Sequence, residues 1–296
     1  MAERFVKVGD WRLWTEDFGQ PGDPAILLIH GAGTQGIWWD EELCGRLVDC
    51  GRHVIRYDLR DAGESTTRAY DVPYDLEDLA TDATGVLDAY GVDDAHVVGV
   101  SVGGMIALYT ALNHPARVKT VTAIYTSPVL RETIEAFVLG QDVSCDLPLA
   151  RPADYPDLSK VMAEAELNPP TTREDHVEAL LTALRIGSGS QYTLDEKHWR
   201  SIVERSYDRA QNWDLRNNTY SAILASSHDV RPRLLDLSMP VLAISGSDDM
   251  VCKPEHGEAI ASTAPHGTYV LVEGTGHSIH PAVYPIWQSA IAKHTI

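Results

Sequence analysis

The chain has 296 residues, 44% of them hydrophobic and 23% charged, and its formal net charge is −19 at pH 7. This length and composition are ordinary for a globular protein with a full hydrophobic core. The negative charge argues against partners such as nucleic acids and anionic membrane surfaces, and no apolar run reaches the roughly 18–20 residues that span a bilayer.

The N-terminal segment and the cysteines indicate a cytoplasmic protein without a metal site. Residues 1–7 are charged and lack the apolar core of a secretory signal. The four cysteines are scattered, with no Cys-x-x-Cys pair and no histidines at the spacing of metal ligands. We therefore expect free thiols and no bound metal.

Short apolar runs alternate with amphipathic segments of helical period over residues 1–126. The predicted strands are 5–8, 11–18, 25–30, 53–57, 94–100 and 118–125. The predicted helices are 37–50, 75–90 and 105–112. Such alternation is typical of an α/β protein with a mainly parallel sheet that helices cover on both faces.

The pattern changes between residues 127 and 231, where strand signals vanish. The helices predicted there are 132–139, 158–166, 173–186, 195–212 and 215–227. Strands at 241–245 and 267–272 and helices at 254–264 and 282–294 then resume the α/β pattern. We predict a core formed by residues 1–126 and 232–296, with residues 127–231 inserted as a helical cap.

A Gly-x-Ser-x-Gly motif centred on Ser101 joins a predicted strand to a predicted helix. This spacing fits a sharp strand–turn–helix elbow that exposes the serine hydroxyl, while the glycines keep other side chains away. The amide of Val102 would then lie at a helix N-terminus, where it can stabilise an oxyanion. For the pentapeptide alone, an ordinary Gly/Ser turn is the alternative.

Four other short segments each follow a predicted strand. They are His30-Gly31-Ala32-Gly33, Asp58-Leu59-Arg60-Asp61-Ala62-Gly63-Glu64-Ser65, Gly246-Ser247-Asp248-Asp249 and Gly274-Thr275-Gly276-His277. Serine, aspartate and histidine in this chain order, each after a strand, resemble the α/β-hydrolase superfamily over essentially the whole chain. The resemblance implies that fold and a hydrolytic enzyme.

The resemblance also implies a catalytic triad for ester hydrolysis. Ser101 is the nucleophile, His277 is the general base and later the acid, and Asp249 orients the imidazole. Asp248 remains an alternative to Asp249, because a shift of one residue within the turn would exchange them. The implied mechanism passes through an acyl-enzyme and needs no cofactor.

The implied oxyanion hole consists of the backbone N–H groups of Ala32 and Val102. Arg60 and Asp61 resemble the structural loop pair of the family. His30 is expected to pack this loop and not to act as a base.

Three segments are similar to the aclacinomycin methylesterase group, whose members act on esters of bulky polyketides. They are residues 14–19, 56–68 and 95–99. The sequence departs from that group at His30-Gly31-Ala32 and in much of the insertion. The resemblance implies a small-molecule ester as substrate, either a polyketide methyl ester or a lactone such as a macrolide.

Large aromatic side chains and histidines are frequent near the oxyanion segment and in the cap. Those expected to bind substrate are Trp38, Trp39, His198, Trp199, Trp213 and His228. Rigid aromatic walls suit a fused-ring or macrocyclic ligand. For each residue, packing of the cap against the core is the alternative.

Two other functions stay open. The same serine and histidine support hydrolysis of a carbon–carbon bond, and some proteins use this scaffold only to bind small molecules. Haloalkane and epoxide chemistry is disfavoured, because those enzymes carry an aspartate where this chain has Ser101. The sequence is compatible with a homodimer.

Overall fold

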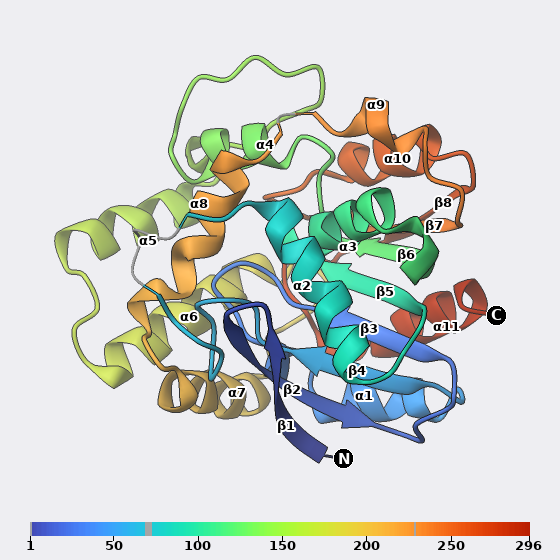
Figure 1. Ribbon diagram of the computed structural model, residues 1–296. Helices are drawn as coiled ribbons and strands as arrows, with labels where there is room; N and C mark the ends of the chain where they lie inside the picture. Colours follow the sequence, from blue (N-terminus) through green and yellow to red (C-terminus); the bar gives the residue numbers. More distant parts are fainter. Residues whose placement is uncertain (1, 69–72, 228) are drawn as a thin grey trace.

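The computed structural model describes residues 2–68, 73–227 and 229–296, and in them eight strands form one sheet (Figure 1). The strands are β1 (Ala2–Val8), β2 (Trp11–Phe18), β3 (Ala25–Ile29), β4 (His53–Tyr57), β5 (Ala95–Val100), β6 (Val118–Ile124), β7 (Val241–Gly246) and β8 (Gly267–Val272). Their order is β1-β2-β4-β3-β5-β6-β7-β8. The first two strands pair antiparallel with their neighbours, and the remaining six pair in parallel.

The strands follow the predicted ranges to within one residue at each end, except that β1 begins at Ala2 and not at residue 5. The β1–β2 hairpin turns at Gly9, which has a φ of 55°, and Val8 pairs with Trp11. Every residue of β3, β4 and β5 is buried, as expected for the apolar runs of β3 and β5 in the middle of a parallel sheet, while the buried Arg56 of β4 is ion-paired with Glu16. The predicted α/β fold is confirmed.

Helices cover both faces of the sheet. One face packs against α2 (Leu76–Ala89), α3 (Val102–Asn113) and α10 (Pro254–Thr263), and its core includes Leu79, Val86 and Ile106. The other face packs against α1 (Glu41–Val48) and α11 (Tyr284–His294). The aspartate Asp75 starts α2 with a reciprocal capping box, which explains why this amphipathic segment begins where it was predicted to begin.

The first helix differs from the prediction of one helix over 37–50. A single 3-10 turn, η1 (Gly36–Trp38), comes first, and α1 begins only at Glu41. Asp40 stops the two from merging, because its backbone is extended and its side chain accepts the N–H of Leu43 at 2.8 Å. An aspartate at the N-cap is a strong helix-start signal that the apolar period had obscured.

Most of the helices between β6 and β7 lie on the left in Figure 1, whereas the last of them lies at the upper right, next to α10. They are α4 (Leu130–Phe137), α5 (Pro156–Leu167), α6 (Arg173–Gly187), α7 (Glu196–Arg209), α8 (Asn218–Ala225) and α9 (Arg231–Leu234), with 3-10 turns at Pro152–Asp154 and Asp214–Asn217. We keep the word cap for residues 127–231. Leu181 and Trp199 of the cap join the core on the α1–α11 face, whereas Ile223 joins the core on the other face. The cap is therefore packed continuously onto the core.

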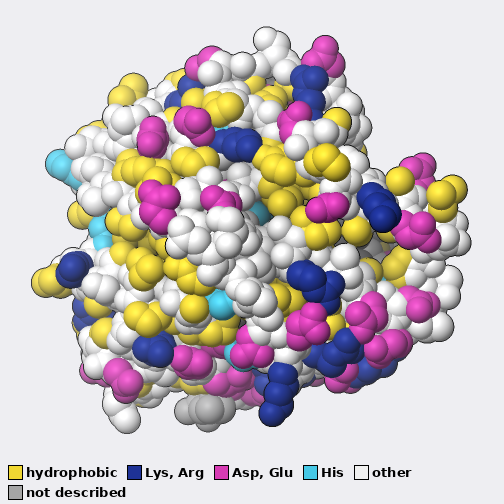
Figure 2. Space-filling view, turned by 180° about the vertical axis from the view of Figure 1, so that it is seen from behind, with side chains coloured by type: hydrophobic (Ala, Val, Ile, Leu, Met, Phe, Trp, Pro, Cys, Tyr) yellow, Lys and Arg dark blue, Asp and Glu magenta, His cyan; other side chains and the backbone are white. Residues whose placement is uncertain are grey.

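Figure 2 shows acidic side chains spread over the back of the molecule, with Lys and Arg side chains among them. Two further 3-10 turns span Pro115–Arg117 and Pro281–Val283. Among the helices in the described ranges, none has both the length and the apolar character that crossing a bilayer requires.

Candidate active site

Ser101 lies at the sharp junction between β5 and α3. Its φ of 56° and ψ of −122° form a strained backbone conformation that non-glycine residues rarely adopt. The neighbouring chain leaves no room for side chains. A Cβ on Gly99 would lie 2.0 Å from the carbonyl oxygen of Gly103, and a Cβ on Gly103 would lie 2.2 Å from that of Ile29. The two glycines of the motif are therefore required by close packing around the elbow.

Two further side chains, from the ends of two other strands, extend a chain of hydrogen bonds from Ser101. His277, in the loop after β8, has Nε2 at 3.1 Å from Ser101 Oγ. Its Nδ1 lies 2.8 Å from Oδ2 of Asp249, which follows β7. Since a carboxylate accepts the Nδ1 proton, Nε2 is left free to accept the serine proton. This arrangement can activate a serine hydroxyl as a nucleophile.

The two candidate aspartates have different surroundings. Asp249 is almost fully buried, and its second oxygen, Oδ1, accepts the N–H groups of Val251 and Cys252, both at 2.8 Å. Asp248 instead accepts the N–H of Ser190, in the cap, at 2.7 Å. The hydrogen bond from Ser190 lowers the pKa of Asp248. The structure thus brings Asp249 to the imidazole and Asp248 to a cap loop.

The predicted oxyanion amides lie close to Ser101. Ala32 lines the cavity beside the serine, and a Cβ on the preceding Gly31 would lie 3.5 Å from Ser101 Cβ. Val102 begins α3, so its N–H has no acceptor within the helix. Both residues therefore lie beside Ser101, and a role of their amides in binding an oxyanion belongs to the mechanism proposed below.

His30 has a structural place in this loop, as expected. Burial lowers its pKa to about 4, although a hydrogen bond to the Gly31 carbonyl opposes this shift. The backbone N–H of Leu59 donates to Nε2 at 3.0 Å, so the ring proton is on Nδ1, which donates to Gly31 O at 2.8 Å. The neutral ring joins the oxyanion segment to the loop after β4.

The predicted loop pair Arg60 and Asp61 is also structural. Arg60 forms a bidentate ion pair with Asp82 of α2. Asp61 accepts hydrogen bonds from Tyr74 and from Asn218 of the cap. Neither residue reaches Ser101.

A cavity of about 160 Å³ opens over Ser101 and His277. Apolar side chains from the core and from the cap form most of its wall. They are Trp38, Val100, Leu130, Ile134, Phe137, Val138, Leu184, Tyr220, Ile223, Val251 and Ile279. An apolar cavity of about 150 Å³ is large enough to bind benzene. The site therefore accommodates an apolar group about the size of one aromatic ring.

The expected substrate-binding tryptophans are distributed differently from the prediction. Trp38 lines the cavity. Trp199 and Trp39 are fully buried behind it and do not line it, so the expectation that they contact substrate is corrected. Trp199 packs on Trp38 with ring centroids 5.2 Å apart, and Trp39 packs on Trp287 at 6.1 Å. Trp199 thus packs at the interface of cap and core, whereas Trp39 packs within the core.

His198 and Trp213 do not line the cavity either. His198 has Nε2 at 2.9 Å from Oδ2 of Asp40, the residue that caps α1. Trp213 packs against Tyr207, with ring centroids 4.9 Å apart, within the cap. The prediction for both is therefore corrected, because His198 joins the cap to the core and Trp213 packs within the cap. His228 lies outside the described residues.

The cavity also contains residues that the sequence analysis did not select. Leu130, Ile134 and Phe137 are spaced by four and three residues on α4, so their apolar period on a cap helix was the available signal. Val251 and Ile279 each lie two residues after a triad member, and that proximity along the chain could have identified them.

Comparisons with known proteins bear on the family and the fold of the chain. A family model described as "alpha/beta hydrolase fold" matches residues 24–281. Rhodomycin D methylesterases DauP of Streptomyces sp. (strain C5) and DnrP of Streptomyces peucetius are each 30% identical to this chain, and each match covers 100% of this chain and 98% of the relative. The structure of an esterase from Exiguobacterium antarcticum is similar in fold, with a TM-score of 0.75, 21% identity and 98% of both chains covered.

Proposed function

Because the chain belongs to the α/β-hydrolase family, we propose that it hydrolyses a carboxylic ester of a bulky small molecule through an acyl-enzyme on Ser101. The observation that carries the mechanism is the approach of His277 Nε2 to Ser101 Oγ at 3.1 Å, with Asp249 behind the imidazole. The methylesterase relatives support an ester as the substrate.

In this mechanism Ser101 Oγ attacks the ester carbonyl carbon while His277 Nε2 takes the hydroxyl proton. The amides of Ala32 and Val102 stabilise the negative charge on the former carbonyl oxygen. The tetrahedral intermediate collapses, and His277 gives its proton to the departing alcohol. A water molecule then attacks the acyl-enzyme while His277 accepts its proton, and His277 passes that proton to Ser101 Oγ as the bond to the acyl group breaks, which releases the carboxylic acid and restores the enzyme.

The cavity limits how such a substrate binds. Its volume of about 160 Å³ is well below the roughly 300–1,000 Å³ of pockets that enclose drug-sized ligands. We infer that the ester end and one adjoining group enter, while the bulk of the molecule rests on the rim. Val138 lines the cavity and is 38% exposed, and the adjacent Leu139 is 47% exposed, so the rim at the end of α4 is apolar.

Among the proposed substrates, a polyketide methyl ester fits these limits better than a macrolactone. A methyl ester has a single carbon on the alcohol side, and its large acyl part can lie on the apolar rim. The name of the rhodomycin D relatives indicates a methyl ester as their own substrate. A macrolactone carries a long chain on both sides of the carbonyl and needs more room.

The proposal is tested first with a serine-reactive phosphonate and p-nitrophenyl acetate. We expect one phosphonate adduct per chain, mapped to Ser101 by peptide mass spectrometry, and hydrolysis of the acetate. A panel of polyketide methyl esters, macrolides and simple acyl esters, followed by product release, then identifies the substrate class. A chain without adduct and without turnover would be a binding protein, and turnover of macrolides alone would exclude the methyl ester.

Replacement of a cavity aromatic in the cap is expected to weaken binding of a bulky ester selectively. Tyr220→Ala removes a partly buried ring from the cavity wall. The loss of its apolar contact, about 1.4 kcal/mol, should raise KM for the bulky substrate about tenfold. KM for p-nitrophenyl acetate, which reaches fewer wall residues, should change less than twofold.

Tyr207→Ala is the matched control for this measurement. Tyr207 is also a partly buried cap tyrosine, but it packs on Trp213 and not in the cavity. We expect it to leave both KM values near those of the unmodified chain. Equal losses on the two substrates after Tyr220→Ala would assign Tyr220 a structural role and contradict the bulky substrate.

A further inference from the structure

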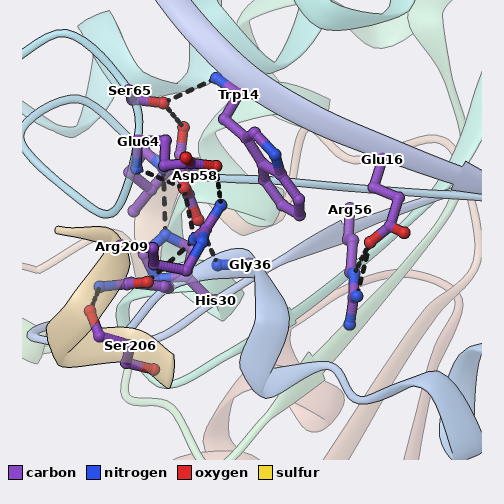
Figure 3. Close-up of polar contacts among 12 residues, drawn as sticks. Trp14, Glu16, His30, Gly36, Arg56, Asp58, Glu64, Ser65, Ser206 and Arg209 are labelled. Atoms are coloured by element: carbon purple, nitrogen blue, oxygen red, sulfur yellow. Dashed lines mark hydrogen bonds and ion pairs between the residues drawn. The ribbon is translucent and has the colours of Figure 1, made fainter. Parts of the chain in front are cut away.

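A largely buried arginine at the end of α7 joins the cap to the core, and the mechanism above does not use it (Figure 3). The Arg209 side chain is only 10% exposed. Its Nη1 donates to Asp58 Oδ2 at 2.7 Å and to Gln35 Oε1 at 2.9 Å. Its Nη2 donates to Glu64 Oε2 at 3.1 Å, and its Cζ lies 4.1 Å from the ring centroid of Trp14. Five donor positions in a rigid plane suit such a multiply bonded site, and lysine could not reproduce it.

Asp58 connects this arginine to the segment that carries the oxyanion amide. Its carboxylate is fully buried, and Oδ1 accepts the N–H of Gly36 at 2.7 Å. Gly63 makes room for the ion pair. A Cβ on that glycine would lie 2.1 Å from Asp58 Oδ2 and 2.6 Å from Arg209 Nη1. The Asp-x-Arg-x-x-Gly motif thus contains both the carboxylate and the space that Arg209 occupies.

The oxyanion turn, residues 31–34, is fixed on both of its sides. Before the turn, His30 accepts the N–H of Leu59. After the turn, Gln35 Nε2 donates to the carbonyl oxygen of Ser206 in α7 at 2.7 Å, and Trp38 Nε1 donates to Ser206 Oγ at 3.0 Å. The last turn of α7 therefore holds the segment that follows Ala32 at several points.

We propose that Arg209 is a positioning residue that fixes the oxyanion turn through Asp58 and Gln35. This inference rests on the proposed function, because the turn matters only if an oxyanion forms at Ser101. It assigns the cap a part in stabilising the transition state in addition to substrate binding. Removing one oxyanion donor altogether costs about 10²–10³ in kcat, so a displaced donor is expected to cost about 10- to 100-fold.

The test uses the full chain with Arg209→Met, which keeps the length of the side chain and removes its donors. We expect kcat for p-nitrophenyl acetate to fall about 10- to 100-fold while KM stays within twofold. Affinity for a trifluoromethyl ketone, whose hemiketal oxyanion would occupy the oxyanion hole, should fall by the same factor as kcat/KM. Arg200→Met is the matched control. Arg200 lies on the same helix but pairs with Glu174 and Glu178 within the cap, so kcat should not change.

A second variant separates positioning from loss of stability. Arg209→Met leaves the buried Asp58 unpaired, which lowers the thermal midpoint of unfolding. Adding Asp58→Asn removes that charge, so the midpoint should recover while kcat remains low. Recovery of kcat together with the midpoint would overturn the proposal, as would an Arg209→Met chain with unchanged kcat. An inactive unmodified chain that gives no phosphonate adduct would instead refute the proposed function itself.

Discussion

Ser101→Ala is expected to lower kcat for any ester substrate by about 10⁴- to 10⁶-fold without unfolding the protein, as for removal of a triad nucleophile in other serine hydrolases. Alanine retains the Cβ, so the backbone at φ 56° experiences no new contact, and only the attacking oxygen is lost. The measurement is kcat of the purified variant on p-nitrophenyl acetate, with circular dichroism to verify the fold. Residual activity above a tenth of the original would rule out Ser101 as the nucleophile.

His277→Ala should be about as inactive, since the imidazole is the base that Ser101 needs. The double variant should be hardly worse than either single variant. Because both residues act in the same chemical step, removal of either one already abolishes their joint contribution to kcat, and the two losses do not add. Additive losses would mean that the two residues act in separate steps and that the hydrogen bond between them is incidental.

The second large effect is expected at Asp249. Asp249→Asn should lower kcat about 10⁴-fold, the loss known from the corresponding change in a serine protease. The backbone donors at Val251 and Cys252 would hold the amide oxygen, leaving the NH₂ group to face His277 Nδ1. The imidazole proton would then move to Nε2, where it prevents the ring from accepting the proton of Ser101.

Asp248→Asn provides the comparison within the same turn. An asparagine there still offers an oxygen to the N–H of Ser190 and does not face the imidazole, so kcat should stay within about threefold. The two variants are measured side by side on p-nitrophenyl acetate, with thermal unfolding as a check of the fold. A reversed pattern of losses would identify Asp248 as the acid.

Local signals were enough to predict the sheet, and the resemblance to the hydrolase family selected Ser101, His277 and Asp249, with Asp248 left as an alternative. Each of these residues follows a strand, and the carboxyl ends of parallel strands meet at one edge of the sheet. The positions of the three residues along the chain therefore predicted that they lie together at that edge of the sheet. The predicted start of α1 was wrong because the apolar residues Ile37 and Trp38 continue the helical period across Asp40, the N-cap of α1.

The cavity wall was harder to predict, because it depends on how separate helices pack. Trp199 and Trp213 look alike as aromatic residues of the cap, yet one packs behind Trp38 and the other within the cap. Periodicity shows which face of a helix is apolar but not which partner that face meets. The ion pair of Arg209 and Asp58, 151 residues apart, could not be predicted from sequence for the same reason.

The contacts of the α7 end limit the exchange of cap segments between related enzymes. A chimaera that replaced the region between β6 and β7 would lose Arg209 and Ser206 while retaining Asp58 and Gln35 in the core. The recipient would then carry a buried carboxylate without its counter-charge. These contacts therefore determine where a cap segment can be cut when it is exchanged to change the substrate range. Either the graft begins after the α7 terminus, or the transplanted helix is given the arginine and the serine at the same two positions.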